Sequence, residues 1–310
     1  MIMSGALTRL YPMVQFKKDT WEIDEFDCAS MFLLIGSERA LLIDCGMGIG
    51  DLRGAVEMLT DKPVTVVLSH GHVDHTGNAR QFPEVWLHPA DQGCHIPEAL
   101  SWRKGDVEHI ARRQKDCIGS PYTMFHLYPY DIEVDLREPT EPMPIVRDLT
   151  DGMEFDLGGG RIVTAYHCPG HTAGEMVFLD RAARTLIAGD ALNYNLGVGA
   201  APLQTTLKAL RRIRDMAGEY DGIYNGHHDF RALGAPLDDD CLPTVIDMCE
   251  RVVRTGEYIP CQVPSFWGQH VPLTRACAGE SGDIFAKFGK RVLLHQGRNF
   301  LSIDPDNIRE

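Results

Sequence analysis

Short apolar runs separated by turn residues dominate the first third of the chain. Runs of Val, Ile, Leu and aromatic residues that are bounded by Gly, Asp or Ser are typical of β-strands. The pattern predicts strands at residues 10–16, 20–26, 29–35, 40–43 and 64–68. Segment 50–59 instead repeats its apolar residues with helical spacing and predicts an amphipathic helix.

The same alternation of short elements continues along the rest of the chain. Further strands are expected at 84–88, 152–157, 161–166, 175–179, 185–188 and 222–224, helices at 203–217 and 238–257, and a closing hairpin at 291–295 and 299–303. Strands mixed with helices in this way predict an α/β or α+β fold.

Two stretches break the pattern. Residues 89–144 contain a predicted helix at 106–115 and an aromatic and proline-rich run at 121–130, which is more chain than a connection between neighbouring elements needs. We interpret about 91–145 as an inserted segment. It covers a site, makes a subunit contact or only buries a small hydrophobic cluster. Residues 259–278, with Phe266 and Trp267, are irregular too. We expect one domain over 1–310, with a C-terminal helix and hairpin at about 238–305.

The composition excludes some partners. An apolar content of 44% suits a globular chain, and a net charge of −14 disfavours nucleic acid, which needs a basic face. The basic group Lys208, Arg211, Arg212 and Arg214 is interpreted as a solvated helix face. The nine cysteines form no Cys-x-x-Cys pair, and neither a signal peptide nor a membrane span is visible. We therefore expect a cytoplasmic protein that contacts no membrane and acts on a small molecule, with a homodimer as one option.

The densest chemistry lies in the run Ser69-His70-Gly71-His72-Val73-Asp74-His75-Thr76-Gly77. It follows the strand expected at 64–68, so it forms a strand-to-helix loop, with a helix expected from Asp74 to about Arg80. Imidazole and carboxylate side chains suit a divalent metal of the zinc type. On a tight loop, His70 and His72 can point to one centre while Asp74 and His75 point to a second.

This run resembles the signature of the metallo-β-lactamase-fold hydrolases. The resemblance implies a four-layer αββα sandwich with a metal site at the strand ends of its two sheets. Further segments resemble the remaining motifs of the family, and each follows an expected strand: Asp44-Cys45-Gly46, His167-Cys168-Pro169-Gly170-His171, Gly189-Asp190 and Asn225-Gly226-His227. The motifs cover 44–227, and the insertion and tail lie outside the resemblance.

The resemblance implies a role for each motif residue. His70, His72 and His171 would hold one metal, Asp74, His75 and His227 a second, and Asp190 would bridge them. Asp44 would accept the outer N–H of a bound histidine, or it is only a turn aspartate. His228 is the alternative to His227. His167 and Cys168 fall outside the ligand positions, and His88 is expected at the core edge or as a helix cap.

The implied cofactors are two divalent ions, zinc first, with iron or manganese as alternatives. A hydroxide bridging the ions would be the nucleophile, and Asp74 would also guide a proton to the leaving group. The reaction would be hydrolysis of a carboxylic ester, thioester or lactone, as in glyoxalase II-like and lactonase-like members. Tyr194 resembles the lactonase tyrosine that contacts the substrate carbonyl, although it follows Asp190 by four positions rather than three.

Departures from the family pattern exclude some of its branches. His72 stands where the flavo-di-iron branch carries Glu, and no helical glutathione-binding tail of the glyoxalase II type is visible. Two alternatives remain: a persulfide-dioxygenase-like enzyme with one iron, and a non-catalytic binding protein on the same fold. Finally, we expect residues 117–130, together with Phe266 and Trp267, to wall the substrate pocket or an adjoining dimer contact.

Overall fold

Two β-sheets packed face to face form the centre of the computed structural model, which describes residues 7–25, 29–93, 96, 105, 136, 138–227, 231–258, 262–264, 270–272 and 292–309. The first sheet has seven strands in chain order. They are β1 (Met13–Lys17), β2 (Thr20–Asp24), β3 (Ser30–Ile35), β4 (Ala40–Ile43), β5 (Val64–Val67), β6 (Glu84–Leu87) and β7 (Ile145–Asp148).

The second sheet has five strands in the order β13-β11-β10-β9-β8. Their bounds are β8 (Glu154–Asp156), β9 (Ile162–His167), β10 (Met176–Asp180), β11 (Thr185–Gly189) and β13 (Gly222–Asn225). A three-stranded sheet joins β12 (Asn195–Val198), β17 (Asn299–Ile303) and β16 (Val292–Gln296), and β14 (Gln262–Pro264) pairs with β15 (His270–Pro272).

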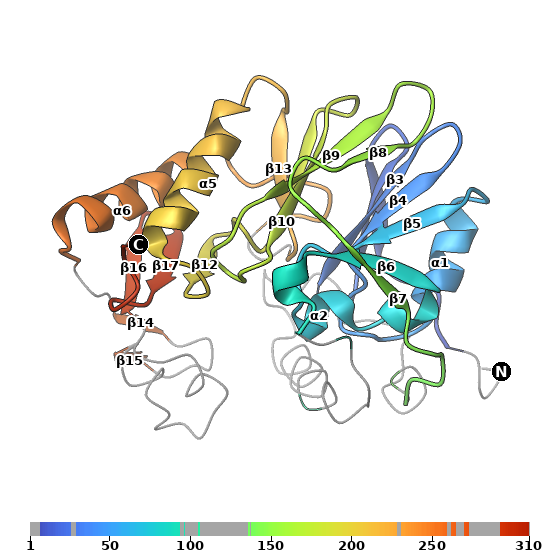
Figure 1. Cartoon of the computed structure of the whole chain (residues 1–310), viewed down its shortest axis with the longest axis horizontal. Coiled ribbons are helices and arrows are strands. Elements are labelled where there is room, and N and C mark those ends of the chain that lie inside the picture. Colours follow the sequence, from blue (N-terminus) through green and yellow to red (C-terminus); the bar gives the residue numbers. More distant parts are fainter. Residues whose placement is uncertain are drawn as a thin grey trace.

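Three apolar layers hold these sheets and the helices together. The middle layer packs Phe32 and Leu41 of the first sheet against Val163 and Phe178 of the second. On the outer face of the first sheet lies α1 (Leu52–Leu59), and on that of the second lie α5 (Leu203–Asp215) and α6 (Cys241–Thr255). Figure 1 shows the resulting order, from α5 and α6 on the left to α1 on the right. The expected αββα sandwich is confirmed.

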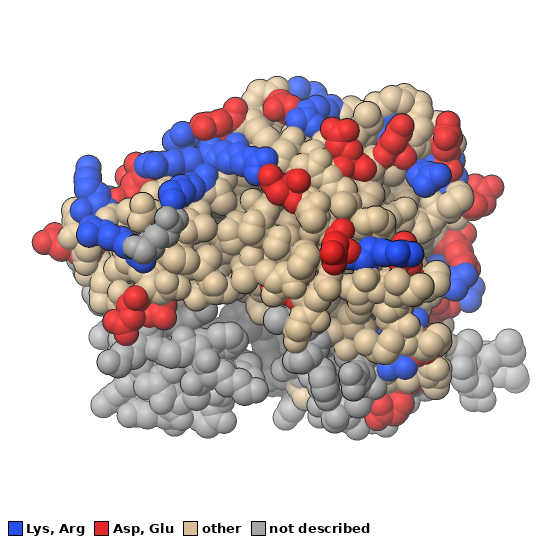
Figure 2. Space-filling view, in the orientation of Figure 1, with Lys and Arg blue, Asp and Glu red and all other residues tan. Residues whose placement is uncertain are grey.

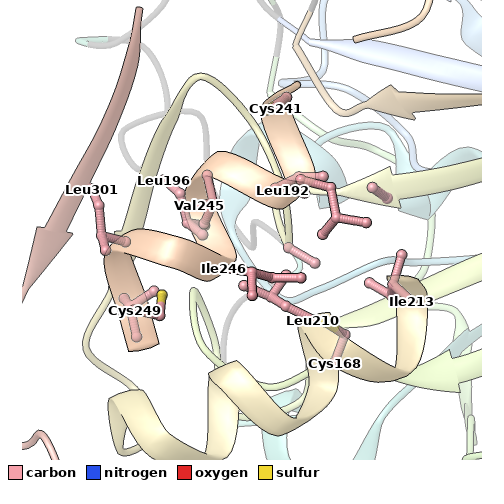
Figure 3. Close-up of a cluster of buried hydrophobic side chains, with 14 of the residues drawn as sticks. Cys168, Leu192, Leu196, Leu210, Ile213, Cys241, Val245, Ile246, Cys249 and Leu301 are labelled. Atoms are coloured by element: carbon pink, nitrogen blue, oxygen red, sulfur yellow. The ribbon is translucent and has the colours of Figure 1, made fainter. Parts of the chain in front are cut away.

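The outer layer around α5 and α6 buries long aliphatic side chains together with three thiols. Figure 3 shows Leu210 of α5 close to Ile246 of α6, with Cys241 and Cys249 towards the two ends of α6, and Cys168 belongs to the same cluster. Among the described residues the free cysteines are Cys45 and these three, and all are buried. Burial raises the pKa of each of these thiols, so they act as small apolar side chains.

The predicted strands and helices are largely confirmed, with ends that shift by one to three residues. The helix expected from Asp74 to about Arg80 is wrong in extent. It divides into α2 (Val73–Thr76) and a 3-10 turn, η1 (Ala79–Gln81). Gly77 separates them because its N–H donates to Gly46, and a Cβ there would lie 2.0 Å from the carbonyl carbon of Met47.

Four of the described strands were not predicted: β7, β12, and the pair β14 and β15, which lies in the stretch 259–278 that was expected to be irregular. β12 lies between the strand expected at 185–188 and the helix expected at 203–217, and it pairs in parallel with β17, a partner about one hundred residues away. β7 pairs in parallel with β6 at the sheet edge and exposes Ile145, so its apolar pattern is weak. The predicted helix at 106–115, the segment 117–130, Phe266, Trp267 and His228 lie outside the described residues.

Figure 2 shows the Lys and Arg side chains gathered along α5 on this face of the molecule. Arg211 pairs with Glu250, Arg212 with Asp151 and Arg214 with Asp215. These exposed pairs are what a solvated helix face presents. No helix in the described part of the chain combines the length and apolarity that a bilayer crossing requires.

Candidate metal centre

The candidate ligands follow strands that end at one side of the two sheets, on loops or, for Asp74 and His75, on α2. His70, His72, Asp74 and His75 follow β5, His171 follows β9, Asp190 follows β11 and His227 follows β13. β4 pairs in parallel with β5, and β11 pairs in parallel with β13, so the loops that follow them emerge at the same edge. The structure brings all of these side chains together.

Three histidines form the first group. His70 Nε2 lies 3.1 Å from His72 Nδ1, which lies 3.0 Å from His171 Nε2. His70 is fully buried, whereas His171 keeps 21% of its side-chain surface exposed. These nitrogens lie close enough together to hold one metal ion.

Asp74, His75 and His227 form the second group. Asp74 Oδ2 lies 3.6 Å from His75 Nε2 and 3.4 Å from His227 Nε2. Their ligand atoms are also close enough to hold a metal ion. His75 is fully buried, and Asp74 is 26% exposed, so this group faces both the core and the opening of the site.

Asp190 lies between the two groups. Its Oδ2 is 3.5 Å from His171 Nε2, 3.4 Å from His227 Nε2 and 3.8 Å from His75 Nε2. His70, His75 and Asp190 make a third, overlapping group. A carboxylate in this place can touch ions on both sides. Gly226 permits the approach, because a Cβ there would lie 2.9 Å from Asp190 Oδ1.

The tautomers fixed by outer hydrogen bonds fit a metal. Gly197 O can only accept, so the His171 Nδ1 it contacts at 3.2 Å carries the proton. His75 Nδ1 donates to Asp44 Oδ2 at 3.0 Å. The Ser69 hydroxyl donates to Asp44, which leaves its lone pair to accept from His70 Nδ1 at 3.0 Å. Each of these three rings therefore turns its Nε2 inward, where it can bind a metal once any proton on it has left.

Unpartnered buried atoms support the same conclusion. His75 Nε2 and Asp190 Oδ1 are buried and have no hydrogen-bond partner. Such orphaned polar atoms are unfavourable in a folded protein unless an ion or a water molecule binds them. The donor set of imidazoles and carboxylates suits a divalent ion such as zinc.

The electrostatics differ between the two groups. Burial lowers the pKa of His70 and His72 and lowers that of His171 to about 4, so these rings are neutral. Burial alone would also lower the pKa of His75, but Asp74, Asp44 and Asp190 raise it to about 9. Without a metal, the second group therefore carries protons that a cation would displace.

The charged histidines of the second group keep the carboxylates of Asp74 and Asp190 ionised. Burial opposes ionisation of Asp74 and Asp190, but the neighbouring histidines His75 and His227 hold both pKa values well below their usual range. At neutral pH both carboxylates are therefore ionised, and without a metal the protonated His75 and His227 balance their charge.

Buried carboxylates outside the predicted motifs hold the ligand loops. Glu25 accepts from the backbone N–H groups of Met47, Gly48 and Ile49. Glu175 Oε1 accepts from Asp190 N at 3.0 Å, and Asp91 accepts from Gly71 N and Gly174 N. None of the three was predicted from the sequence, because the backbone groups that they bind lie 15 to 83 positions away and leave no local signal.

The remaining candidates are not members of the three groups of ligand atoms. Tyr194 is 3% exposed in the core beside α6, where its hydroxyl accepts from Asp238 N at 2.8 Å and Arg298 lies over its ring. His88 caps η2 (Pro89–Asp91) by accepting from Ala90 N, which confirms the expected capping role, and it stacks on His167. Asp44 adopts φ 68°, a left-handed conformation that is uncommon outside glycine.

Comparison with known proteins relates this site to a family. The profile of the Metallo-beta-lactamase superfamily matches residues 24–227, which include all of the candidate ligands. A solved metallo-beta-lactamase from Pontibacter korlensis superimposes with a TM-score of 0.51 at 17% identity, covering 77% of this chain and 98% of that one. That likeness concerns the fold alone.

Two curated relatives carry names that state an activity. The human acyl-coenzyme A thioesterase MBLAC2 is 28% identical over 177 residues, which is 53% of this chain and 58% of that protein. The atrochrysone carboxyl ACP thioesterase of Aspergillus fumigatus is 25% identical over 196 residues, 62% of this chain and 48% of its own length. The chain thus spans about half the length of these relatives.

Proposed function

Because the chain belongs to the metallo-beta-lactamase superfamily, we propose that it is a metal-dependent hydrolase that cleaves a thioester, with carboxylic esters and lactones as the related substrates. The observation that carries the proposal is the set of histidine nitrogens that converge around Asp190. We further propose that the centre holds two divalent ions, with zinc as the first choice.

The candidate ligands divide between two subsites. His70, His72 and His171 would hold one ion, and Asp74, His75 and His227 the other, with Asp190 between them. When bound, the ions would supply an acidified water as nucleophile and an electrophile for the carbonyl. The chain's own residues fix the positions, exclude solvent and handle the proton.

Asp74 is the residue best placed to move that proton. Its carboxylate is ionised and keeps 26% of its surface exposed, whereas His70 and His75 are fully buried. A partly exposed carboxylate at the mouth of the site can accept a proton from the nucleophile and release it towards the leaving group.

Thioesters come first among the substrates because both named relatives are described as thioesterases, one of coenzyme A and one of ACP. A thiolate is also a better leaving group than an alkoxide, so the site needs less general-acid help with this substrate. The two relatives share only 25–28% identity with this chain over about half of their length, so oxyesters and lactones are also included in the screen.

The test combines metal analysis with a substrate screen. Purified protein is loaded with zinc, iron or manganese, and metal per chain is measured by elemental analysis. Each form is then assayed with acyl-coenzyme A thioesters, matched oxyesters and lactones, with His72→Ala as the inactive comparison. We expect thioester hydrolysis by the metal-loaded protein that chelation abolishes. Equal hydrolysis by the His72→Ala variant, or none by any metal form, would overturn the proposal.

A further inference from the structure

Buried side chains outside the ligand set connect the loops of each candidate subsite across the two sheets. The first is Asp91, which is 1% exposed and ends η2 after β6. Its Oδ2 accepts from Gly71 N at 3.1 Å and from the Thr172 hydroxyl at 2.6 Å, and its Oδ1 accepts from Gly174 N at 2.7 Å. One carboxylate thus binds the loop after β5 and the loop after β9.

These contacts flank the first group of histidines. Gly71 lies between His70 and His72, and Thr172 directly follows His171. His72 and His171 come from different sheets, yet their ring nitrogens lie 3.0 Å apart. The carboxylate of Asp91 packs tightly against the loop after β9, because a Cβ at Gly174 would lie only 2.7 Å from its carboxyl carbon.

The second connection is the ion pair of Glu22 on β2 with Arg231. Both side chains are buried, at 0% and 2% exposure. The pair is bidentate, with Nη2 to Oε1 at 2.7 Å and Nη1 to Oε2 at 3.1 Å. The same guanidinium donates from Nε to the Asn225 side chain at 2.7 Å and from Nη2 to the Asn225 carbonyl at 3.1 Å.

This pair acts next to the second group. Asn225 ends β13 and is two residues before His227. Arg231 therefore ties the end of β13 in the second sheet to Glu22 in the first. The backbone adds one more link there, because Ser30 N donates to Gly226 O at 2.7 Å.

We propose that Asp91 and the Glu22–Arg231 pair are positioning residues that set the two metal subsites separately, Asp91 for His70, His72 and His171, and Glu22–Arg231 for His227. Asp91 and the Glu22–Arg231 pair share no residue, and each forms hydrogen bonds with the backbone beside the ligands of one group. The inference rests on the proposed metal centre but not on the reaction. A substitution at Asp91, or one in the Glu22–Arg231 pair, should weaken one metal-binding step and leave the other intact.

The test uses the isosteric variants Asp91→Asn and Glu22→Gln in the full chain. Metal-free protein is titrated with Zn²⁺ by calorimetry, and Co²⁺ absorption spectra report the coordination. His72→Ala and Asp74→Ala, which each remove a ligand from one group, identify the two binding steps. We expect Asp91→Asn to weaken the step lost in His72→Ala by about 10–100-fold, and Glu22→Gln to weaken the step lost in Asp74→Ala similarly.

Arg161→Lys is the matched control. Arg161 pairs with Asp180 at the far end of β10, with exposures of 10% and 0%, and also donates to Ile35 O of the first sheet. It is thus a buried pair that joins the sheets away from the site. We expect it to lower the unfolding temperature while both metal steps stay unchanged.

Several outcomes would overturn the inference: unchanged metal binding in both variants, equal weakening of both steps by either one, or loss of a metal step in the control. If Glu22→Gln does not fold, Arg231→Lys replaces it with the same expectation. If each variant weakens one metal-binding step but no thioester is hydrolysed, the proposed function is rejected and this inference stands. If thioesters are hydrolysed but each variant does not weaken a separate metal-binding step, this inference is rejected and the proposed function stands.

Discussion

At the residue scale, the chemistry depends on which nitrogen of each histidine carries a proton. Asp44 illustrates this, because its carboxylate accepts from His75 Nδ1 and from both the amide and the hydroxyl of Ser69. It thereby directs two histidines of different groups, one of them through Ser69. A single buried carboxylate sets the inward lone pairs on which metal binding depends.

Asp190→Ala should lower bound metal below two per chain and abolish hydrolysis. The substitution removes the carboxylate that lies within 3.8 Å of three histidines and leaves two cations without a negative charge between them. Elemental analysis after dialysis, paired with a thioester assay, measures both effects. Two metals per chain and a normal rate in this variant would contradict a dinuclear centre.

Metal affinity at the second group should rise with pH, and affinity at the first group should not. The raised pKa of His75, about 9, means that a proton must leave before metal binds below that pH. His171, with a pKa of about 4, is neutral throughout the range from pH 6 to 8. We expect a loss of about tenfold per pH unit for each proton displaced as the pH falls. Zn²⁺ calorimetry at several pH values measures it, and equal slopes for the two steps would contradict it.

Tyr194→Phe separates a structural role from a catalytic one. Its hydroxyl accepts the backbone N–H of Asp238 at 2.8 Å, and removing it leaves that donor without this partner. We expect a loss of about 1 kcal/mol in the free energy of unfolding, measured by denaturant titration. A large fall in kcat at unchanged stability would instead support the contact with substrate that the sequence suggested.

At the scale of elements, the ligand loops depend on helices that cover the outer faces of the sheets. α5 and α6 pack against the second sheet through a dense aliphatic cluster (Figure 3). Near the N-terminus of α5, Thr206 lies against Gly170, where a Cβ would be 2.7 Å from the threonine side chain. Packing in this layer therefore reaches the loop that carries His171.

Leu210→Ala should lower the free energy of unfolding by about 2–5 kcal/mol, because Leu210 is fully buried between α5 and α6 and the change leaves a cavity. Met58→Ala, at a position 55% exposed on α1, is the surface control and should change stability far less. Urea unfolding followed by circular dichroism compares the two. Equal effects would contradict the described packing.

At the scale of the whole molecule, the metal centre lies where both sheets meet, so bound metal should hold them together. Its ligands come from loops of both sheets, and a cation would attract the carboxylates of Asp74, which follows a strand of the first sheet, and of Asp190, which follows a strand of the second. We expect chelation to lower the unfolding temperature and Zn²⁺ to restore it, since a ligand at one hundred times its Kd adds about 2.7 kcal/mol. Scanning calorimetry measures this, and an unchanged transition would argue against a metal that links the sheets.

The sequence by itself determined most of the strands, the main helices and the ligand types. Apolar runs such as 40–43 and 64–68 are local signals, and the motif that contains His70 and Asp74 combines several metal-binding residue types within a few positions. Because parallel strands end at one edge, placing each motif after a strand was enough to expect that the side chains converge.

Only the tertiary structure decided what supports those ligands. Glu22 and Arg231 lie 209 positions apart, and Asp91 and Gly174 lie 83 apart, so no local pattern relates them. β12 became a strand through its pairing with β17, and Tyr194 lies in the core through its contact with Asp238. Side-chain pattern encodes the tendency to form an element or bind an ion, whereas the partner of a buried charge or an edge strand is set by which surfaces meet on folding.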